Sequence, residues 1–237
     1  ATTAQVSLFG EDQQTASLPL VEVREWTDAE RLAHEKSALG FYVSGHPYTA
    51  HAAELSQIVR QPLSALQPKR EPTLIAGIVT ALRIQAGRRG KMAFVTLDDG
   101  GGSAEIVVYN EVLDAARSLL REDQLIIAEV KVQPRMTDDG QVQGLRISAE
   151  AVFDLTAIRK RHARGLRLRC NGKATVDYLF DLLTPFRDGD CPITVEYSNH
   201  GLSGDIEFPD TWRVKLDEAL IDGLSEWLSP ADVSVIY

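Results

Sequence analysis

The sequence predicts a mainly β protein with a smaller α/β part: a short helical N-terminal region, a five-stranded barrel and a C-terminal α/β domain. Within the first 68 residues, apolar residues recur at helical spacing. From Thr73 onward, short runs rich in β-branched residues are separated by glycine-containing turns. After residue 158, helical and strand patterns alternate. We therefore expect three parts, residues 1–68, 69–158 and 159–237.

The N-terminal part is expected to contain two helices. Thr27 or Asp28 is able to act as the N-cap of the first, and Glu30 lies three residues after Thr27, as a capping box requires. Gly45 and Pro47 are turn signals that end this helical pattern. A second helix is predicted over residues 49–59.

The middle part is predicted to form a five-stranded barrel. Its strand patterns lie at residues 73–86, 91–99, 103–110, 124–134 and 145–155. A helical pattern at 111–123, with Asn110 as its natural cap, separates the third strand from the fourth. Three strands, a helix and two strands is the order expected of an OB-fold, a Greek-key barrel.

The C-terminal part is predicted to be a small α/β domain. Strands are expected at 165–170, 192–198, 204–208, 212–216 and 233–237, with helices at 175–186 and 217–228. A domain of this size is able to hold a hydrophobic core of its own.

Composition limits the classes of function. The formal net charge is −9, which disfavours a general nucleic-acid binder, but residues 165–237 alone carry −7. Basic side chains gather instead at 87–91 (GRRGK) and 159–169. The second cluster is open to two interpretations, a DNA contact or a solvated connector between domains. A nucleic-acid surface, if present, is expected in the middle of the chain.

Other features concern location and processing. Cys170 and Cys191 lack the C-x-x-C spacing of a zinc site and are expected to be buried free thiols. No apolar run is long enough for a membrane span, and the N-terminus lacks the pattern of a signal peptide. We therefore expect a cytoplasmic protein with no membrane partner. The chain begins with Ala1 rather than Met, which raises the hypothesis that it is a piece of a longer protein.

No active site is predicted in these residues. The carboxylates of Asp98 and Asp99 are the first pair to test for metal binding, but adjacent strand residues face opposite sides, and three glycines follow. A hairpin turn explains the pair better. The five histidines show no metal-ligand spacing. We expect no catalytic residues, no metal ligands and no cofactor here.

A binding surface is easier to justify. In an OB-fold, single-stranded nucleic acid usually crosses the second and third β-strands. It is flanked by the loop between β-strands 1 and 2 and the loop between β-strands 4 and 5. The basic candidates for phosphate contacts are Arg88, Arg89, Lys91 and Arg135, and the aromatic candidates for base stacking are Phe94 and Tyr109. The alternative is that both aromatics fill the barrel and the basic turn is only solvated.

The leader contains QVSLF, which has the form of a linear motif. Gln5 offers an amide for hydrogen bonds, Val6 and Ser7 are spacers, and Leu8 and Phe9 are able to enter an apolar pocket on a partner. The alternative is that Leu8 and Phe9 pack against the helices that follow.

The motif does not stand alone. Together with EKSALGFYVSGHP, the stretch from IAGIVTALRIQAGRRGKMAFVTLDD to YNE, and LIIAEVKV, it resembles the C-terminal part of the bacterial DNA polymerase III alpha subunit family. The resemblance covers essentially the whole chain. It implies that residues 5–9 bind the β sliding clamp, with Val6 in place of the commoner Leu, that the OB-fold engages single-stranded template DNA, and that the last domain contacts the tau subunit of the clamp loader.

The resemblance also implies what lies elsewhere. The polymerase palm with its catalytic aspartates is not in this sequence, so Mg²⁺ and nucleotidyl transfer are expected in an upstream part of a longer protein. Three alternatives stay open: an OB-fold tRNA anticodon-binding module, an independent single-stranded-DNA-binding protein, and the error-prone polymerase paralogue of the same family.

Overall fold

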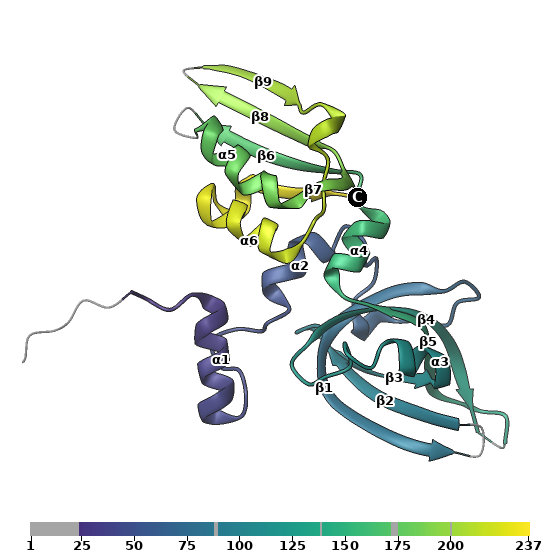
Figure 1. Cartoon of the computed structure of the whole chain (residues 1–237). Helices are drawn as coiled ribbons and strands as arrows, with labels where there is room; N and C mark the ends of the chain where they lie inside the picture. The colour runs from purple at the N-terminus through teal and green to yellow at the C-terminus, as the bar shows by residue number, and fades with distance from the viewer. Residues whose placement is uncertain (1–23, 88–89, 138, 172–174, 200) are drawn as a thin grey trace, which may run out of the picture. The chain divides into compact units, whose positions relative to one another are not determined.

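The computed structural model describes residues 24–87, 90–137, 139–171, 175–199 and 201–237 (Figure 1). The chain divides into two compact units, residues 1–44 and 45–237, and each is considered by itself. The domain boundaries predicted after residues 68 and 158 stay predictions.

The first unit contains α1 (Asp28–Leu39). Thr27 is its N-cap, and the predicted capping box is confirmed: Glu30 N donates to Thr27 Oγ1 over 3.2 Å, and Thr27 N donates to Glu30 Oε2 over 2.8 Å. The helix ends at Gly40, whose φ of 83° lies in the left-handed region that glycine adopts most easily.

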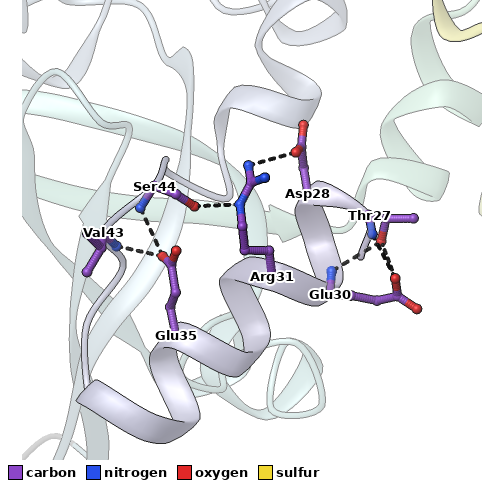
Figure 2. A network of polar contacts seen from close by, with 7 residues as sticks. All are labelled: Thr27, Asp28, Glu30, Arg31, Glu35, Val43 and Ser44. Atoms are coloured by element: carbon purple, nitrogen blue, oxygen red, sulfur yellow. Dashed lines mark hydrogen bonds and ion pairs between the residues drawn. The ribbon is translucent and has the colours of Figure 1, made fainter. Parts of the chain in front are cut away.

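The segment after α1 is held against the same helix (Figure 2). The Glu35 carboxylate accepts hydrogen bonds from the backbone N–H groups of Val43, at 2.7 Å, and Ser44, at 2.9 Å. Both bonds lower the pKa of Glu35, and the bond from Ser44 has the larger effect. Arg31 donates to Ser44 Oγ over 2.8 Å and pairs with Asp28. One turn of α1 therefore fixes where residues 43–44 lie.

The second unit begins with α2 and continues into a closed barrel. The barrel strands and helices of residues 45–162 are α2 (Thr49–Leu55), η1 (Leu63–Ala65), β1 (Thr73–Gly87), β2 (Gly90–Asp98), β3 (Ser103–Tyr109), α3 (Asn110–Ala115), β4 (Leu125–Met136), β5 (Val142–Phe153) and α4 (Leu155–His162). The order around the barrel is β1-β2-β3-β5-β4, with β3 and β5 parallel and the other pairs antiparallel. The predicted OB-fold order is confirmed.

The barrel interior follows from strand alternation. On β2, Ala93, Val95 and Leu97 are fully buried, whereas Phe94 and Thr96 are only partly buried. Successive strand residues face opposite sides of the sheet, so Phe94 lies on the outer face of the barrel. It does not fill the barrel, which was one of the two alternatives for this residue.

The C-terminal domain has a sheet with two helices on one face (Figure 1). Its elements are β6 (Gly165–Asn171), α5 (Val176–Leu183), η2 (Thr184–Phe186), β7 (Arg187–Cys191), β8 (Ile193–Asn199), β9 (Leu202–Glu207), η3 (Asp210–Trp212), α6 (Glu218–Trp227), η4 (Pro230–Asp232) and β10 (Val233–Ile236). The strand order is β10-β6-β8-β9, so β9 is an edge strand. Leu179 and Leu183 of α5 and Leu220 and Leu224 of α6 join a core with the sheet. The predicted α/β domain is confirmed.

The predicted strand at 212–216 is wrong. This segment starts within η3 and touches its neighbours through single bridges from Val214 to Arg187 and to Cys191. The strand β7, which those bridges reach, was not predicted, because RDGDC contains turn-forming residues. A Cβ on Gly189 would lie 2.0 Å from the Val214 carbonyl carbon. Only glycine permits this close passage of two backbones.

Two helices differ from their predicted bounds. The helix predicted over 49–59 ends at Leu55. The helix predicted over 111–123 begins one residue earlier and ends at Ala115, with Tyr109 and not Asn110 at its N-cap. Asn110 has a φ of 32°, and a Cβ on Gly90 would lie 2.0 Å from Asn110 Oδ1. The Asn110 side chain therefore packs against the start of β2 and does not cap the helix.

A cluster of four polar side chains, centred on one buried ion pair, joins four segments of the second unit. Arg159 of α4 is 2% exposed and donates to both carboxylate oxygens of Glu54 on α2, each over 2.8 Å. The hydroxyl of Tyr237, the last residue, donates to Glu54 Oε1 over 2.5 Å, and Glu218 of α6 lies 3.6 Å from Arg159 Nη1. Leu55, beside Glu54, packs with α4 and with the barrel residues Ala76 and Ile127. We call Glu54, Arg159, Glu218 and Tyr237 the hub.

The hub has a defined electrostatic state. Burial would raise the pKa of Glu54, but the hydrogen bonds and charge of Arg159 outweigh it and lower that pKa below its ordinary value. Burial, and then the hydrogen bond to Glu54, raise the pKa of the Tyr237 hydroxyl. The carboxylate is therefore ionised and the phenol neutral at neutral pH.

Replacing Arg159 by alanine should lower the free energy of unfolding by about 3–5 kcal/mol, because Glu54 would keep a buried charge without its cation. The matched control is Arg161→Ala. Arg161 lies on the same helix, is half exposed and pairs with Glu129 at 3.5 Å, so its loss should cost no more than about 1 kcal/mol. Urea denaturation of the whole chain measures both, and equal losses would contradict the assignment of the hub as the stronger contact.

The pH dependence of stability should change in Glu54→Gln. The pKa of Glu54 is lower in the folded than in the unfolded chain, so its stabilisation is complete above the unfolded value of about 4.3 and is lost as the pH falls through the folded pKa. The wild type should therefore be more stable than the variant at pH 7, and the difference should shrink below about pH 4.3. Urea midpoints across this range measure it, and a difference that does not vary with pH would refute the prediction.

Candidate binding grooves

A groove runs across the outer face of the barrel. Residues of β2, β3, β4, β5 and η1 line it, and it encloses about 880 Å³. The lining residues are Leu63, Leu66, Phe94, Ser103, Ala104, Glu105, Val107, Tyr109, Gln133, Pro134, Arg135, Met136, Leu145, Arg146 and Ile147. We call this the barrel groove.

Three predicted DNA contacts meet in the barrel groove. Phe94 comes from β2, Tyr109 from the end of β3, and Arg135 from the end of β4. Strand pairing brings them together, because β2 pairs with β3, and β5 pairs with both β3 and β4. The groove therefore combines two partly exposed rings with an exposed cation.

The remaining predicted residues lie elsewhere. Lys91 is exposed at the start of β2, outside the residues that line the barrel groove. Arg88 and Arg89 lie outside the described residues, as does the motif formed by Gln5, Val6, Ser7, Leu8 and Phe9.

Sequence reasoning missed two arginines at the barrel groove. Arg146 of β5 donates to the Tyr109 hydroxyl over 2.8 Å. Arg83 of β1 lies 5.4 Å from the centre of the Phe94 ring and pairs with Glu105 at 3.1 Å. Alternation along β5 places Arg146 beside the buried Ile147, and this signal was available. Its approach to Tyr109 depends on the parallel pairing of β3 with β5, which periodicity does not reveal.

The acidic pair at the hairpin has a structural role. Asp99 Oδ1 accepts from the N–H groups of Gly101 and Gly102, and Asp99 Oδ2 accepts from Leu63 N over 2.7 Å. Asp98 accepts from Gly100 N and lies 3.4 Å from His46 Nε2. Both carboxylates thus hold the turn and the segments beside it. Among the described residues, no group of three or more His, Cys, Asp or Glu is arranged to hold a metal ion.

The basic stretch at 159–169 is divided between α4 and β6. Arg159 belongs to the hub, Arg161 pairs with Glu129 of the barrel, and Arg169 lies 3.7 Å from Glu196 and 3.8 Å from Asp232. These contacts to flanking elements favour the connector interpretation over a DNA contact.

A second groove lies on the C-terminal domain. It encloses about 360 Å³ between α5, the sheet and η3, and its lining is almost wholly apolar. The lining residues are Cys170, Thr175, Val176, Leu179, Phe180, Val195, Tyr197, Ile206, Glu207, Phe208, Pro209, Trp212 and Trp227. We call this the aromatic groove.

The two cysteines are buried free thiols, as predicted. Burial raises the pKa of Cys191 to about 11 and also raises the pKa of Cys170. Both sulfurs are therefore protonated and unreactive at neutral pH. In the described part of the chain, no helix combines the length and apolar character needed to span a bilayer.

Two family models agree with this architecture. A family model described as an OB-fold nucleic acid binding domain matches residues 73–155, and one described as the C-terminal domain of DNA polymerase III subunit alpha matches residues 178–228. The second OB-fold domain of replication protein A from Methanococcus maripaludis is a structural neighbour, with 19% sequence identity and a TM-score of 0.30 over 40% of this chain and 93% of that one.

Relatives extend the match to nearly the whole chain. DNA polymerase III subunit alpha of Neisseria meningitidis serogroup A is 38% identical over an alignment of 219 residues that covers 91% of this chain and 19% of that protein. The subunit of Escherichia coli strain K12 is 28% identical over an alignment of 244 residues, gaps included, that covers 98% of this chain and 21% of that protein. The chain thus spans about a fifth of the length of these relatives. It belongs to the DNA polymerase III alpha subunit family and corresponds to the C-terminal region of that subunit.

Proposed function

We propose that this region couples a DNA polymerase to its processivity machinery: it binds single-stranded template in the barrel groove, the β sliding clamp through residues 5–9, and the tau subunit of the clamp loader through the last domain. The observation that carries the proposal is the barrel groove itself. It brings Phe94, Tyr109, Arg135 and Arg146 to one face of an OB-fold.

The chemistry of the barrel groove suits single-stranded DNA. Phe94 and Tyr109 offer ring faces to unstacked bases, and Arg135 and Arg146 offer charges to phosphates. Arg83, which pairs with Glu105 and lies over the Phe94 ring, adds positive charge beside the groove, and Glu105 is the single carboxylate among the described residues that line it. This local surplus of cations supports DNA binding in spite of the net charge of the chain, because the acidic excess is concentrated in the last domain.

Changes in the barrel groove should weaken binding of a fluorescent dT oligonucleotide in two distinguishable ways. Phe94→Ala should cost about 1–3 kcal/mol of binding free energy at every salt concentration, because stacking is lost. Arg135→Ala with Arg146→Ala should lower the slope of log affinity against log salt by about 1.4, since each lost phosphate contact contributes about 0.7 for single strands. Fluorescence anisotropy of the whole chain at several salt concentrations measures both.

The matched control is Arg121→Ala. Arg121 is exposed and basic but is not among the described residues that line the barrel groove, so its loss should leave affinity and slope nearly unchanged. Equal effects of Arg121→Ala and the groove changes would reduce DNA binding to a general charge effect and would contradict the proposed site.

The clamp contact rests on the QVSLF motif and on the family to which the chain belongs. A short peptide that buries Leu8 and Phe9 gains about 1.5–3 kcal/mol for each side chain and loses part of this to ordering. The expected affinity is micromolar. Such a contact is sufficient in a polymerase that also holds DNA, because tethering gives the second contact a high effective concentration.

Titration of the whole chain against purified β clamp tests the motif. Changing Gln5, Leu8 and Phe9 together to alanine should abolish binding in the micromolar range, because the amide and both apolar anchors are removed. Val6→Leu is the matched control and should bind at least as tightly, since Leu is commoner at that place in such motifs. Undiminished binding by the alanine variant would place the clamp contact elsewhere.

The tau contact is supported by the charge and surface of the last domain. Residues 165–237 carry a net charge of −7, which repels DNA and is compatible with a protein partner. Nucleotidyl transfer with Mg²⁺ is proposed for a longer protein that includes this region, and no step of it is assigned to these residues.

The alternatives are separated by these measurements. A tRNA anticodon-binding module would bind tRNA with no need for Gln5, Leu8 or Phe9, and the match of relatives over 91–98% of the chain argues against it. An independent single-strand binder would show salt-dependent DNA binding and no clamp contact. The error-prone paralogue is expected to lack a functional internal clamp motif, so loss of clamp binding in the alanine variant of residues 5, 8 and 9 would count against it.

A further inference from the structure

The aromatic groove lies where the helical layer of the C-terminal domain stops short of the sheet edge. Helices α5 and α6 cover one face of the sheet (Figure 1), and Leu179, Leu183, Leu220 and Leu224 pack there. On the side of β9, no further α-helix of the described chain covers this face, and only the short η3 borders the groove. Val195 of β8 and Ile206 of β9 face each other in register and are left to line the groove.

The floor of the groove is an aromatic cluster. The Phe180 ring lies 4.4 Å from that of Trp212 and 5.9 Å from that of Phe208. Val176 at the mouth is 64% exposed and Ile206 is 52% exposed. Tyr178 and Trp227, whose rings are 5.3 Å apart, extend the apolar surface over α5. Apolar surface of this kind, gathered beside a pocket, is typical of a protein interaction site.

The rim of the groove is acidic. Val176 and Phe180 of α5 line the groove, and Asp177 and Asp181 are the next residues along the helix. Because each residue turns a helix by about 100°, both carboxylates lie beside the groove on the exposed side of α5. Glu207 lines the groove from β9. Arg187, 4.2 Å from the centre of the Trp212 ring, is a cation beside the aromatic cluster. The carboxylates outnumber it, and residues 165–237 carry a net charge of −7, so the surroundings of the groove favour a basic ligand.

We propose that the aromatic groove binds a basic amphipathic helix of a protein partner, which lies beside α5 and completes the helical layer over β8 and β9. Apolar side chains of the helix enter the groove at helical spacing, and its Lys or Arg residues face Asp177, Asp181 and Glu207. The assignment rests on the proposed contact with tau and names the surface and the chemistry of that contact.

Charge selects this occupant over two others. A nucleic acid would bring phosphates to an acidic rim, and a second copy of this domain would bring the same negative charge. A strand added to the free edge of β9 would pair through its backbone and would need neither Val176 nor Phe180 on α5. A basic helix uses both the apolar lining and the acidic rim.

Titration of the whole chain with purified tau subunit tests the assignment. Ile206→Glu and Val176→Glu should each weaken binding about tenfold or more, because a carboxylate would be buried in an apolar contact. Both residues are already exposed, so the fold should survive, and circular dichroism checks this. Ile84→Glu is the matched control, since Ile84 is 56% exposed on β1 of the barrel and should not affect tau.

A second arm tests the rim. Asp177→Asn with Asp181→Asn should weaken binding severalfold at low salt and reduce its salt dependence. If the unaltered chain binds tau and the Ile206 and Val176 variants bind equally well, the groove assignment is overturned while the proposed partner stands. Slower hydrogen exchange at β9 amides in that case would indicate strand addition instead. If the unaltered chain does not bind tau, the proposed partner fails and the groove assignment fails with it.

Discussion

The second unit depends on a buried charge that it cannot leave unpaired. Arg159 stands on the helix that follows the barrel, and its guanidinium is satisfied mainly by Glu54, more than a hundred positions earlier in the chain. Tyr237 completes the arrangement from the last residue. An uncompensated charge in this environment costs several kcal/mol. The cluster therefore fixes the positions of α2, α4 and Tyr237 relative to one another.

The two grooves divide binding chemistry between two domains. The barrel groove joins aromatic rings to arginines, which suits bases and phosphates. The aromatic groove joins a larger set of rings to carboxylates, which suits an apolar surface with basic flanks. The net charge of −9 does not reveal this division, because it is the sum of a basic barrel face and an acidic last domain. Charge distribution, and not total charge, carries the functional information here.

Contacts between segments far apart in the sequence account for these errors in predicting elements. RDGDC reads as a turn, yet Gly189 lets it pass close to Val214 as a short strand, while WRVKL reads as a strand and forms only single bridges. Asn110 reads as a helix cap and instead packs against Gly90. In each case a contact with a distant segment overrode the local preference, which a window of neighbouring residues does not contain.

The sequence by itself determined the barrel, because alternation such as that of Ala93, Val95 and Leu97 against Phe94 and Thr96 admits only one inward face. It also determined the capping box at Thr27 and the acidic character of the last domain. Only the tertiary structure decided which outward residues meet. Arg146 contacts Tyr109 across the parallel pair β3 and β5, and Phe180 of α5 contacts Trp212 of η3. Both contacts depend on how separate elements pack and not on spacing along the chain.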